Sequence, residues 1–168
     1  MNNPDRIESL SVILITKNAA RYLDECLRSV AWAGQIVVVD SGSTDATLEI
    51  ASKHGAEIVK TEDWPGFGPQ KNRALDRATG EWVLSIDADE VVTPELATAI
   101  RAAISNPDQD AWEISRLSSF CGQWIHHSGW QPDWIVRLFR RGRARFSDHL
   151  VHESILVPSA SIGRLSGK

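Results

Sequence analysis

The chain has 168 residues, of which 42% are apolar and 24% charged, and this composition is typical of a globular domain with a hydrophobic core. Its formal net charge of −4 argues against a nucleic-acid-binding protein, because neutralising phosphates requires a surplus of lysine and arginine. The two cysteines, Cys26 and Cys121, lie too far apart in sequence to form a metal-binding pair, and they imply no disulfide framework. We therefore expect a reducing compartment.

The N-terminal segment lacks the basic and apolar regions of a signal peptide, and no apolar run reaches the ~18 residues expected of a membrane-spanning helix. One stretch, 137–145, is strongly basic and reads "RLFRRGRAR". Such a stretch could contact an anionic ligand or an anionic membrane surface. We therefore expect a cytoplasmic protein, with peripheral contact to the inner face of the membrane as a further possibility.

Strand and helix patterns alternate along the first hundred residues. Short apolar runs rich in β-branched residues predict four strands, at 10–16, 35–40, 56–61 and 81–87. Segments with helical spacing of apolar residues, or with helix start and stop signals, predict four helices, at 21–32, 41–55, 68–80 and 93–104.

Local signals mark the ends of these helices. The second helix opens on capping residues and closes on Gly55, and the third ends at Gly80. The fourth begins with Thr93 as its N-cap and Pro94 at its first position. The first helix carries Cys26, which we expect to be a small core residue.

The composition changes after residue 106, where tryptophan and histidine become frequent. Segments 110–120 and 133–141 predict two more strands. Strand alternation places Arg137 and Arg140 on opposite faces, so these two guanidinium groups cannot share one ligand. We expect residues 107–168 to continue the same domain and to complete a site that the first half begins.

This order of strands and helices predicts an α/β fold, with a mostly parallel sheet that carries helices on both faces. Sheets of this kind bind ligands at the carboxyl ends of their strands. Asp40 falls at the end of the second predicted strand, and Asp87 and Asp89 fall at the end of the fourth. Carboxylates from two strands are therefore expected at one edge of the sheet.

Asp87 and Asp89 are the first candidate metal ligands. Two carboxylates about 6 Å apart repel each other by about 3 kcal/mol at an effective dielectric constant of about 20, and a divalent cation would reverse that cost. Mg²⁺ and Mn²⁺ favour carboxylate oxygens and often share their coordination shell with substrate phosphates. The alternative is a solvated acidic loop in which Glu90 only precedes a helix.

The segment 36–47 is a candidate ligand-binding turn and reads "IVVVDSGSTDAT". Its amides and hydroxyls could hold a ribose or a base, and the following helix N-terminus would favour an anion. The alternative is ordinary helix capping by Ser43, Thr44 or Asp45. The two functions are compatible, because capping and ligand contact use different residues of the turn.

Four blocks in order carry a family resemblance: "SVILITKNAARYLDECLRSV", "IVVVDSGSTDAT", "GPQKNRAL" and "WVLSIDADE". Together they resemble the family-two inverting, nucleotide-sugar-dependent glycosyltransferases with the GT-A fold, whose sheet is Rossmann-like. "GFGPQKNRAL" and "PDWIVRLFRRG" resemble the bacterial lipopolysaccharide-core β-glucosyltransferases within that family. The resemblance implies a single domain over 1–168, with a nucleotide-sugar-binding half at 1–106. It also implies an acceptor-side half at 107–168 that is shortened at its C-terminal end.

The resemblance also implies roles for individual residues. Those expected to contact the nucleotide sugar are Thr16 and Lys17 in the nucleotide pocket, Asp40 on a base such as uracil, Lys71 and Asn72 near the sugar, and Asp87 on ribose or sugar hydroxyls. Asp89 would bind the Mg²⁺ or Mn²⁺ ion that bridges the diphosphate, with Asp87 and His152 as further metal contacts. A purely structural His152 is equally compatible with the sequence.

The acceptor hydroxyl would be deprotonated by a carboxylate. The family's Glu-Asp pair stands here as Pro132-Asp133, a departure that still keeps Asp133 in the position of the base. Glu153 is the second candidate. The alternative for Asp133 is a surface ion pair with Arg137, four residues further on, which would contribute less than about 1 kcal/mol.

The function implied is metal-dependent, inverting transfer of a hexose, such as glucose from UDP-glucose, to a saccharide or lipid-linked saccharide acceptor such as lipopolysaccharide core. The alternative is a nucleotide-sugar-binding module with little or no transfer activity. A nucleotidyltransferase is a third candidate. It is disfavoured because the segment after the first strand, "TKNAARYL", contains no glycine.

Overall fold

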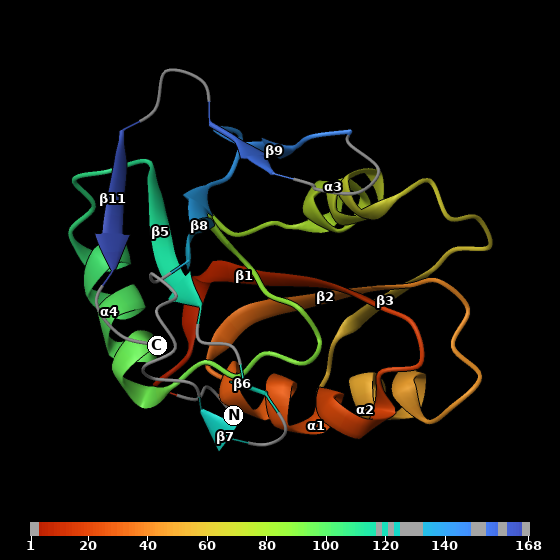
Figure 1. Ribbon diagram of the computed structural model, residues 1–168. Helices are drawn as coiled ribbons and strands as arrows, with labels where there is room; N and C mark the ends of the chain where they lie inside the picture. Colours follow the sequence, from red (N-terminus) through yellow and green to blue (C-terminus); the bar gives the residue numbers. More distant parts are fainter. Residues whose placement is uncertain are drawn as a thin grey trace.

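The structure is a computed structural model and describes residues 4–116, 119–120, 123–124, 133–148, 154–157 and 161–165. Its centre is a seven-stranded sheet in the order β11-β5-β8-β4-β1-β2-β3 (Figure 1). The strands are β1 (Ile7–Thr16), β2 (Ala33–Asp40), β3 (Glu57–Lys60), β4 (Trp82–Ser85), β5 (Ala111–Arg116), β8 (Asp133–Arg140) and β11 (Ile162–Leu165).

The sheet is mostly parallel, as the sequence predicts. β1 pairs in parallel with β2 and β4, β2 with β3, and β11 with β5. β8 is the exception, because it runs antiparallel to both of its neighbours, β4 and β5. Strands from both halves of the chain therefore share one sheet.

Four helices cover the two faces of this sheet: α1 (Ala20–Ser29), α2 (Thr47–Lys53), α3 (Phe67–Arg77) and α4 (Pro94–Ser105). Helices α1, α2 and α4 contribute to one apolar cluster, and α3 contributes to the other (Figure 1). The longest of them, α4, has 12 residues, and none of the helices in the described part of the chain meets the length and apolarity of a bilayer crossing, which takes about 20 residues.

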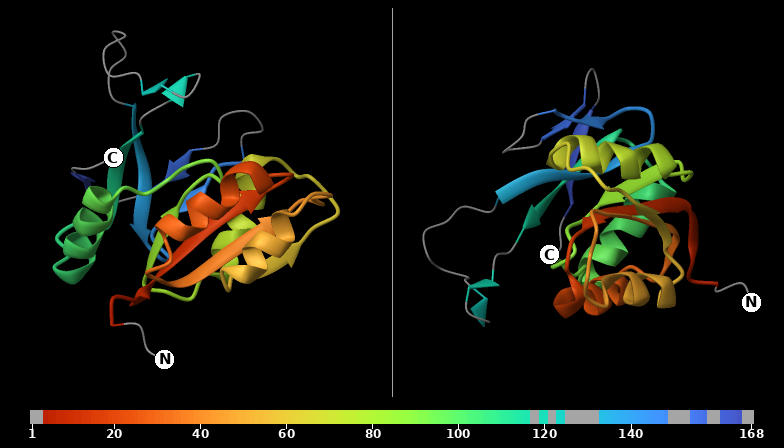
Figure 2. Two further views of the ribbon diagram at one scale, coloured as in Figure 1. Left: turned by 90° about the horizontal axis from the view of Figure 1, so that it is seen from below. Right: turned by 90° about the vertical axis from the view of Figure 1, so that its right-hand side faces the viewer.

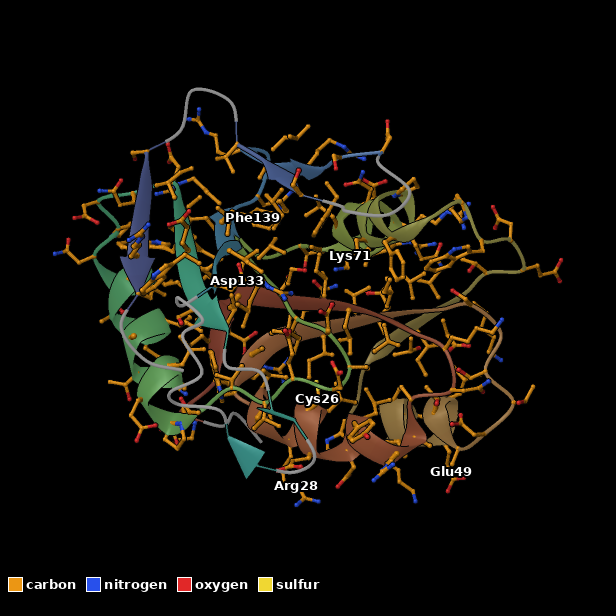
Figure 3. The ribbon with its side chains drawn as sticks, viewed as in Figure 1. Cys26, Arg28, Glu49, Lys71, Asp133 and Phe139 are labelled. Carbon is orange, nitrogen blue, oxygen red and sulfur yellow. The ribbon has the colours of Figure 1, made fainter. Side chains whose placement is uncertain are left out.

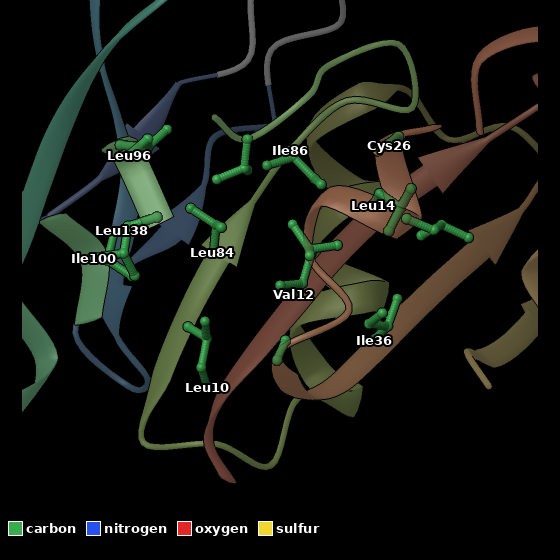
Figure 4. Packing of buried hydrophobic residues seen from close by; sticks show 14 of the residues in the cluster. Leu10, Val12, Leu14, Cys26, Ile36, Leu84, Ile86, Leu96, Ile100 and Leu138 are labelled. Atoms are coloured by element: carbon green, nitrogen blue, oxygen red, sulfur yellow. The ribbon is translucent and has the colours of Figure 1, made fainter. Parts of the chain in front are cut away.

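Both faces of the central strands are buried, which explains their continuous apolar sequences. In β1, Val12 and Leu14 point into the cluster under α1 and α4, whereas Ile13 points into the cluster under α3. Cys26 of α1 packs in the first cluster, as predicted (Figure 4).

Two short ladders lie outside the main sheet. β9 (Arg145–Phe146) pairs with β10 (Ile155–Leu156) on the side of α3. β6 (Ser119–Phe120) pairs with β7 (Gln123–Trp124), and Figure 2 shows this ladder beyond the ends of β5 and β8. The strand predicted over 110–120 is therefore two elements, β5 and β6.

Several helix boundaries differ from the sequence predictions, and the helix predicted over 21–32 ends at Ser29. The helix predicted over 41–55 begins only at Thr47 and ends at Lys53, with Ala46 as its N-cap. Alanine has no polar side chain to cap the helix, and the Asp45 carboxylate accepts from the amide and hydroxyl of Thr47 instead. The helix predicted to end at Gly80 ends at Arg77. The N-cap prediction for α4 is confirmed, since the Thr93 side chain accepts a hydrogen bond from the Leu96 amide.

Gly80 has a different function from the predicted helix stop. A Cβ atom at this position would lie 2.7 Å from the Ser9 carbonyl oxygen and 2.8 Å from the Ser11 amide nitrogen. The Gly80 amide donates to Ser11 Oγ at 2.9 Å. Gly80 is therefore required for the close approach of the α3–β4 connection to β1.

Candidate functional site

The carboxyl ends of three neighbouring strands meet at one edge of the sheet. The register of β1 on β2 places Thr16 beside Asp40, and the register of β1 on β4 places Ile13 beside Ser85. Asp87 therefore follows β4 at the edge where β1 and β2 end. The candidate acids of two separate strands lie on the same side of the molecule.

β8 brings its first residues to this edge from the opposite direction. It is antiparallel to β4, with Leu138 opposite Leu84, so β8 continues past the end of β4 toward its own first residue. Asp133 is the first residue of β8, and its side chain is exposed (Figure 3). The fold therefore places the predicted base at the same edge as the predicted metal ligands.

Asp40 is fully buried and accepts four hydrogen bonds. Oδ1 accepts from the hydroxyls of Thr16 (2.7 Å) and Ser43 (2.6 Å), and Oδ2 accepts from the amides of Gly42 (3.0 Å) and Ser43 (2.8 Å). A carboxylate has about four lone-pair sites, so the protein itself uses them all. Asp40 therefore organises the turn that follows β2, and contact with a base would require one of the two hydroxyls to rotate away.

The turns after β1 and β2 are joined by further hydrogen bonds. Asn18, which has a φ of 51°, donates from its amide to Ser43 Oγ at 2.8 Å and accepts from the Thr44 amide at 2.8 Å. The Ala19 amide donates to Thr47 Oγ1 at 2.8 Å, and the Ala20 amide donates to the Asp45 carboxylate at 3.2 Å. These contacts satisfy the first amides of α1 without a bound anion.

Replacing Asp40 with asparagine is expected to lower the free energy of unfolding by about 3 kcal/mol at neutral pH, because an amide group would face the donors of residues 42 and 43. Burial raises the pKa of Asp40, but the hydrogen bonds, led by those from Ser43, outweigh burial and leave the pKa below its usual value. A lowered folded-state pKa gives stability that is present above the unfolded-state value of about 3.9 and is lost as pH falls through the folded-state value.

Urea denaturation at pH 7 and at pH 3 measures both effects. The difference between the parent protein and the Asp40→Asn variant should be large at pH 7 and smaller at pH 3. An equal difference in the free energy of unfolding at both pH values would contradict the stabilising role of the ionised Asp40 carboxylate.

Two consecutive residues of α3 reach different parts of the site. Gln70 is fully buried and donates to the hydroxyls of Ser41 (3.0 Å) and Thr61 (2.7 Å), which follow β2 and β3. Lys71 donates to Asp87 Oδ1 at 3.2 Å, beyond the end of β4. α3 therefore lies across the strand ends and ties them together.

Asn72 is engaged by main-chain groups of β9. Its Oδ1 accepts from the Phe146 amide at 3.0 Å, and its Nδ2 donates to the Phe146 carbonyl at 3.1 Å. The amide is buried, so these two bonds hold β9 on α3. Contact between Asn72 and the nucleotide sugar stays a prediction, and Lys71 lies close to Asp87.

The segment Asp87–Glu90, which we call the acid turn, follows β4. The carboxylate of Asp87 faces Lys71 and, at 3.5 Å, Arg137. Burial raises the pKa of Asp87, but the positive charges of Lys71 and Arg137 outweigh burial and leave the pKa below its usual value. Asp89 is exposed, and it is therefore the carboxylate of this turn that is open to a ligand.

Cys26 lies beneath the acid turn, on the face of the sheet opposite Lys71 (Figure 3). Its thiol donates to the Asp87 carbonyl at 3.5 Å. Burial, with a smaller contribution from the negative charges of the acid turn, raises the pKa of this thiol to about 12. Cys26 is therefore a neutral packing residue, not a nucleophile.

The acid turn supplies oxygen ligands of the kind that Mg²⁺ and Mn²⁺ prefer. Within the described residues, no three His, Cys, Asp or Glu side chains gather closely enough to hold a cation by themselves. An ion at this edge would therefore take part of its shell from elsewhere, as Mg²⁺ does when one or two carboxylates and substrate phosphates bind it. The residues present fit such a shared site.

Several sequence predictions have other outcomes. Lys17 is exposed at the end of β1. His152 and Glu153 lie outside the described residues. The alternative role of Asp133 as the partner of Arg137 is wrong, because Arg137 pairs with Asp87 and Glu90 instead. Residues four apart on a strand are separated by about 13 Å, too far for a direct ion pair.

Several arginines of the basic stretch 137–145 contact acidic or main-chain groups within the fold. Arg140 pairs with Glu81 and Asp110, and Arg145 pairs with Asp76. Arg141 donates from Nε to the Gly80 carbonyl at 2.8 Å. Acidic side chains of the fold therefore offset part of the positive charge of this stretch.

Sequence reasoning did not identify Gln70, Glu90 and Arg137 as site residues. Gln70 lies within the block "GPQKNRAL" and directly precedes Lys71, which was the available signal. The significance of Glu90 and Arg137 depends on contacts between β4 and β8, whose adjacency the sequence pattern did not reveal.

Comparison with known proteins agrees with this geometry. The lipopolysaccharide core biosynthesis glycosyltransferase LpsC of Rhizobium meliloti (strain 1021) is 32% identical over 165 residues, which cover 92% of this chain and 59% of LpsC. The crystal structure of S. aureus TarS 1-349 matches with a TM-score of 0.71 at 24% identity, over 95% of this chain and 58% of that one.

Several of the matching solved structures contain ligands. S. aureus TarS 1-349 in complex with UDP-GlcNAc matches with a TM-score of 0.60 at 31% identity, over 71% of this chain and 37% of that one. The mannosyltransferase PcManGT from Pyrobaculum calidifontis, in complex with GDP-Man and Mn²⁺, matches with a TM-score of 0.53 at 28% identity, over 66% and 36%.

The chain thus spans 59% of the length of LpsC and 58% of the TarS 1-349 chain. The family model described as "Glycosyl transferase family 2" matches residues 11–162, nearly the whole sequence. With the mostly parallel sheet and the acids at its carboxyl edge, this match establishes that the chain belongs to glycosyl transferase family 2 and has the GT-A fold.

Proposed function

We propose that this chain carries out metal-dependent, inverting transfer of a hexose from a UDP-sugar to a saccharide acceptor. Glucose from UDP-glucose is the first donor to test, and lipopolysaccharide core, free or lipid-linked, is the first acceptor class. The LpsC similarity supports the acceptor class, and the UDP-GlcNAc complex of TarS supports a uridine nucleotide. The observation that carries the proposal is that Asp40 and Asp87 follow neighbouring strands at one edge of the sheet, and that β8 begins with Asp133 beyond the same edge.

The proposed division of labour follows the two halves of the chain. Residues 1–106 bind the donor, with Thr16, Lys17 and the turn held by Asp40 around the nucleotide. Residues 107–168 face the acceptor. Lys71 and Asn72 approach the nucleotide sugar, and the position of Lys71 beside Asp87 at the strand ends supports its part of this role. Peripheral contact with a membrane, through the acceptor, is part of the same proposal.

The acid turn fits a divalent cation, Mg²⁺ or Mn²⁺, bound mainly through Asp89. Such a cation, when bound, offsets the charge that develops on the leaving diphosphate. Asp87 is a weaker candidate ligand because its two oxygens already face Lys71 and Arg137. His152 would favour Mn²⁺ over Mg²⁺, since imidazole is a poor ligand for Mg²⁺.

Asp133 is the proposed general base, and Glu153 is the second candidate. Inversion requires one carboxylate on the side of the anomeric carbon opposite the leaving diphosphate. That carboxylate accepts the proton of the acceptor hydroxyl as its oxygen attacks. Asp133 is supported by its exposure and by its position at the start of β8, which continues past the end of β4.

Calorimetric titration of the protein with UDP, in the presence of Mn²⁺ and of EDTA, tests the donor site. We expect Mn²⁺ to tighten UDP binding by at least about tenfold, or about 1.4 kcal/mol. Equal affinity in both solutions would contradict the metal-dependent proposal. Incubation with UDP-glucose and acceptor saccharides then separates a transferase from a binding module. A transferase would release UDP as it glycosylates the acceptor, whereas a binding module would leave UDP-glucose intact.

A further inference from the structure

Glu90 closes the acid turn on itself. Its amide donates to the Asp87 carbonyl at 3.0 Å, and its Oε2 accepts from the Asp87 amide at 2.7 Å. Both ends of the turn are therefore tied through one residue. Asp89, which lies between these ties, is presented on a short closed loop in which few conformations remain.

Arg137 holds Glu90 from the neighbouring strand. Its guanidinium donates to Glu90 Oε1 at 2.9 Å, and it also reaches the Ser85 carbonyl at 3.4 Å and Asp87 at 3.5 Å. The Arg137 side chain is 11% exposed and that of Glu90 is 23% exposed. An ion pair so sheltered is screened less by salt than the exposed pairs elsewhere on the molecule.

This contact also joins the two halves of the proposed site. Arg137 lies on β8, four residues after Asp133, and a strand is a stiff element that rises about 3.3 Å per residue. Glu90 lies three residues after Asp87 on the segment that follows β4. The Glu90–Arg137 pair therefore ties the turn that presents Asp89 to the strand that begins with Asp133.

We propose that Glu90 and Arg137 are positioning residues, which fix the carboxylate of Asp89 relative to that of Asp133. Neither residue is required to touch the substrate, since each acts through the acid turn. This inference rests on the proposed function, because it assigns the pair to the cation-binding and base residues named there. The competing explanation is an ordinary stabilising ion pair with no effect on ligand binding.

Amide hydrogen exchange, followed by NMR in the ligand-free protein, tests the tie directly. In the Glu90→Ala variant the Asp87 amide loses its acceptor, and we expect its exchange to accelerate at least about tenfold. Arg137→Met should accelerate the same amide, because Glu90 is then released. The control is Glu113→Ala, which breaks the 2.9 Å ion pair with Arg164 between β5 and β11 and should leave the Asp87 amide unchanged.

UDP titration of the same variants, with Mn²⁺ and with EDTA, tests the consequence. Outer-shell partners of metal ligands typically contribute about 10- to 100-fold to metal affinity, so each variant should weaken the Mn²⁺-dependent binding of UDP by about tenfold or more. UDP binding in EDTA should not change. The double variant should bind no more weakly than the single variants, since both changes release the same turn.

The outcomes separate the two proposals. Faster exchange with unchanged Mn²⁺-dependent binding would leave only a structural ion pair and overturn the positioning role. Weaker binding of UDP in EDTA by Arg137→Met would indicate direct contact with the diphosphate and also overturn it. An unchanged exchange rate of the Asp87 amide in the variants would overturn the positioning role and leave the proposed function standing. Equal UDP affinity of the parent protein with and without Mn²⁺ would overturn both.

Discussion

Replacement of Asp89 by asparagine is expected to reduce sugar transfer by at least about a hundredfold. Charge stabilisation by a bound divalent cation is worth several kcal/mol, and each 1.4 kcal/mol corresponds to a factor of ten in rate. An asparagine keeps the size of the side chain but removes the negative charge that a hard cation requires. Asp89 is exposed, so the change should leave the stability of the fold nearly intact.

The measurement combines a transfer assay with UDP titration at several Mn²⁺ concentrations. Asp108→Asn is a matched control, because it removes the same charge from an exposed position after α4. We expect the control to behave as the parent protein does. An Asp89→Asn variant that retains Mn²⁺-dependent UDP binding at the parental affinity would show that the cation is held elsewhere.

Asp133→Asn is expected to lower kcat by about 10²- to 10⁴-fold, the usual contribution of a general base. Its affinity for UDP in the presence of Mn²⁺ should stay at the parental value, because Asp133 lies on β8 and not in the acid turn. The diagnostic result is a lower kcat combined with an unchanged affinity for UDP. It distinguishes a base from a residue that merely supports the donor site.

Glu153→Gln provides the comparison for this second prediction, since Glu153 is the other candidate base. A loss of turnover confined to Asp133→Asn would identify Asp133 as the base. A larger loss in Glu153→Gln, with Asp133→Asn close to the parent, would transfer that role to Glu153. Thermal denaturation of both variants controls for loss of the fold.

Much of the fold was predictable because its signals are local. The β-branched runs identified β1 to β4, and Thr93 with Pro94 identified the start of α4. The ends of parallel strands necessarily meet at one edge, so the grouping of Asp40 with the acid turn followed from the order of elements alone. Hydrophobic periodicity predicted the arrangement of the elements, and the family resemblance then implied roles for individual residues.

Contacts between distant segments were not predictable from the sequence. The alternation in 133–140 predicted a strand but not its antiparallel position between β4 and β5. Asn72 pairs with the main chain of Phe146, 74 residues away, and no local pattern marks that partner. Two of the four hydrogen bonds to Asp40 come from backbone amides and two from the hydroxyls of Thr16 and Ser43, and the direction of these donors depends on the turn geometry.

The central place of β8 has a consequence for how the polypeptide acquires its structure. Until residues 133–140 have been synthesised, β4 is an edge strand with one row of unpaired backbone groups, and β5 has no route into the sheet. Closing the sheet therefore waits for pairing across some fifty residues, which is a slow step for a chain that emerges from its N-terminus. In a fragment that stops at residue 106, β4 would remain an unpaired edge strand. We therefore expect the isolated donor half to self-associate through this edge.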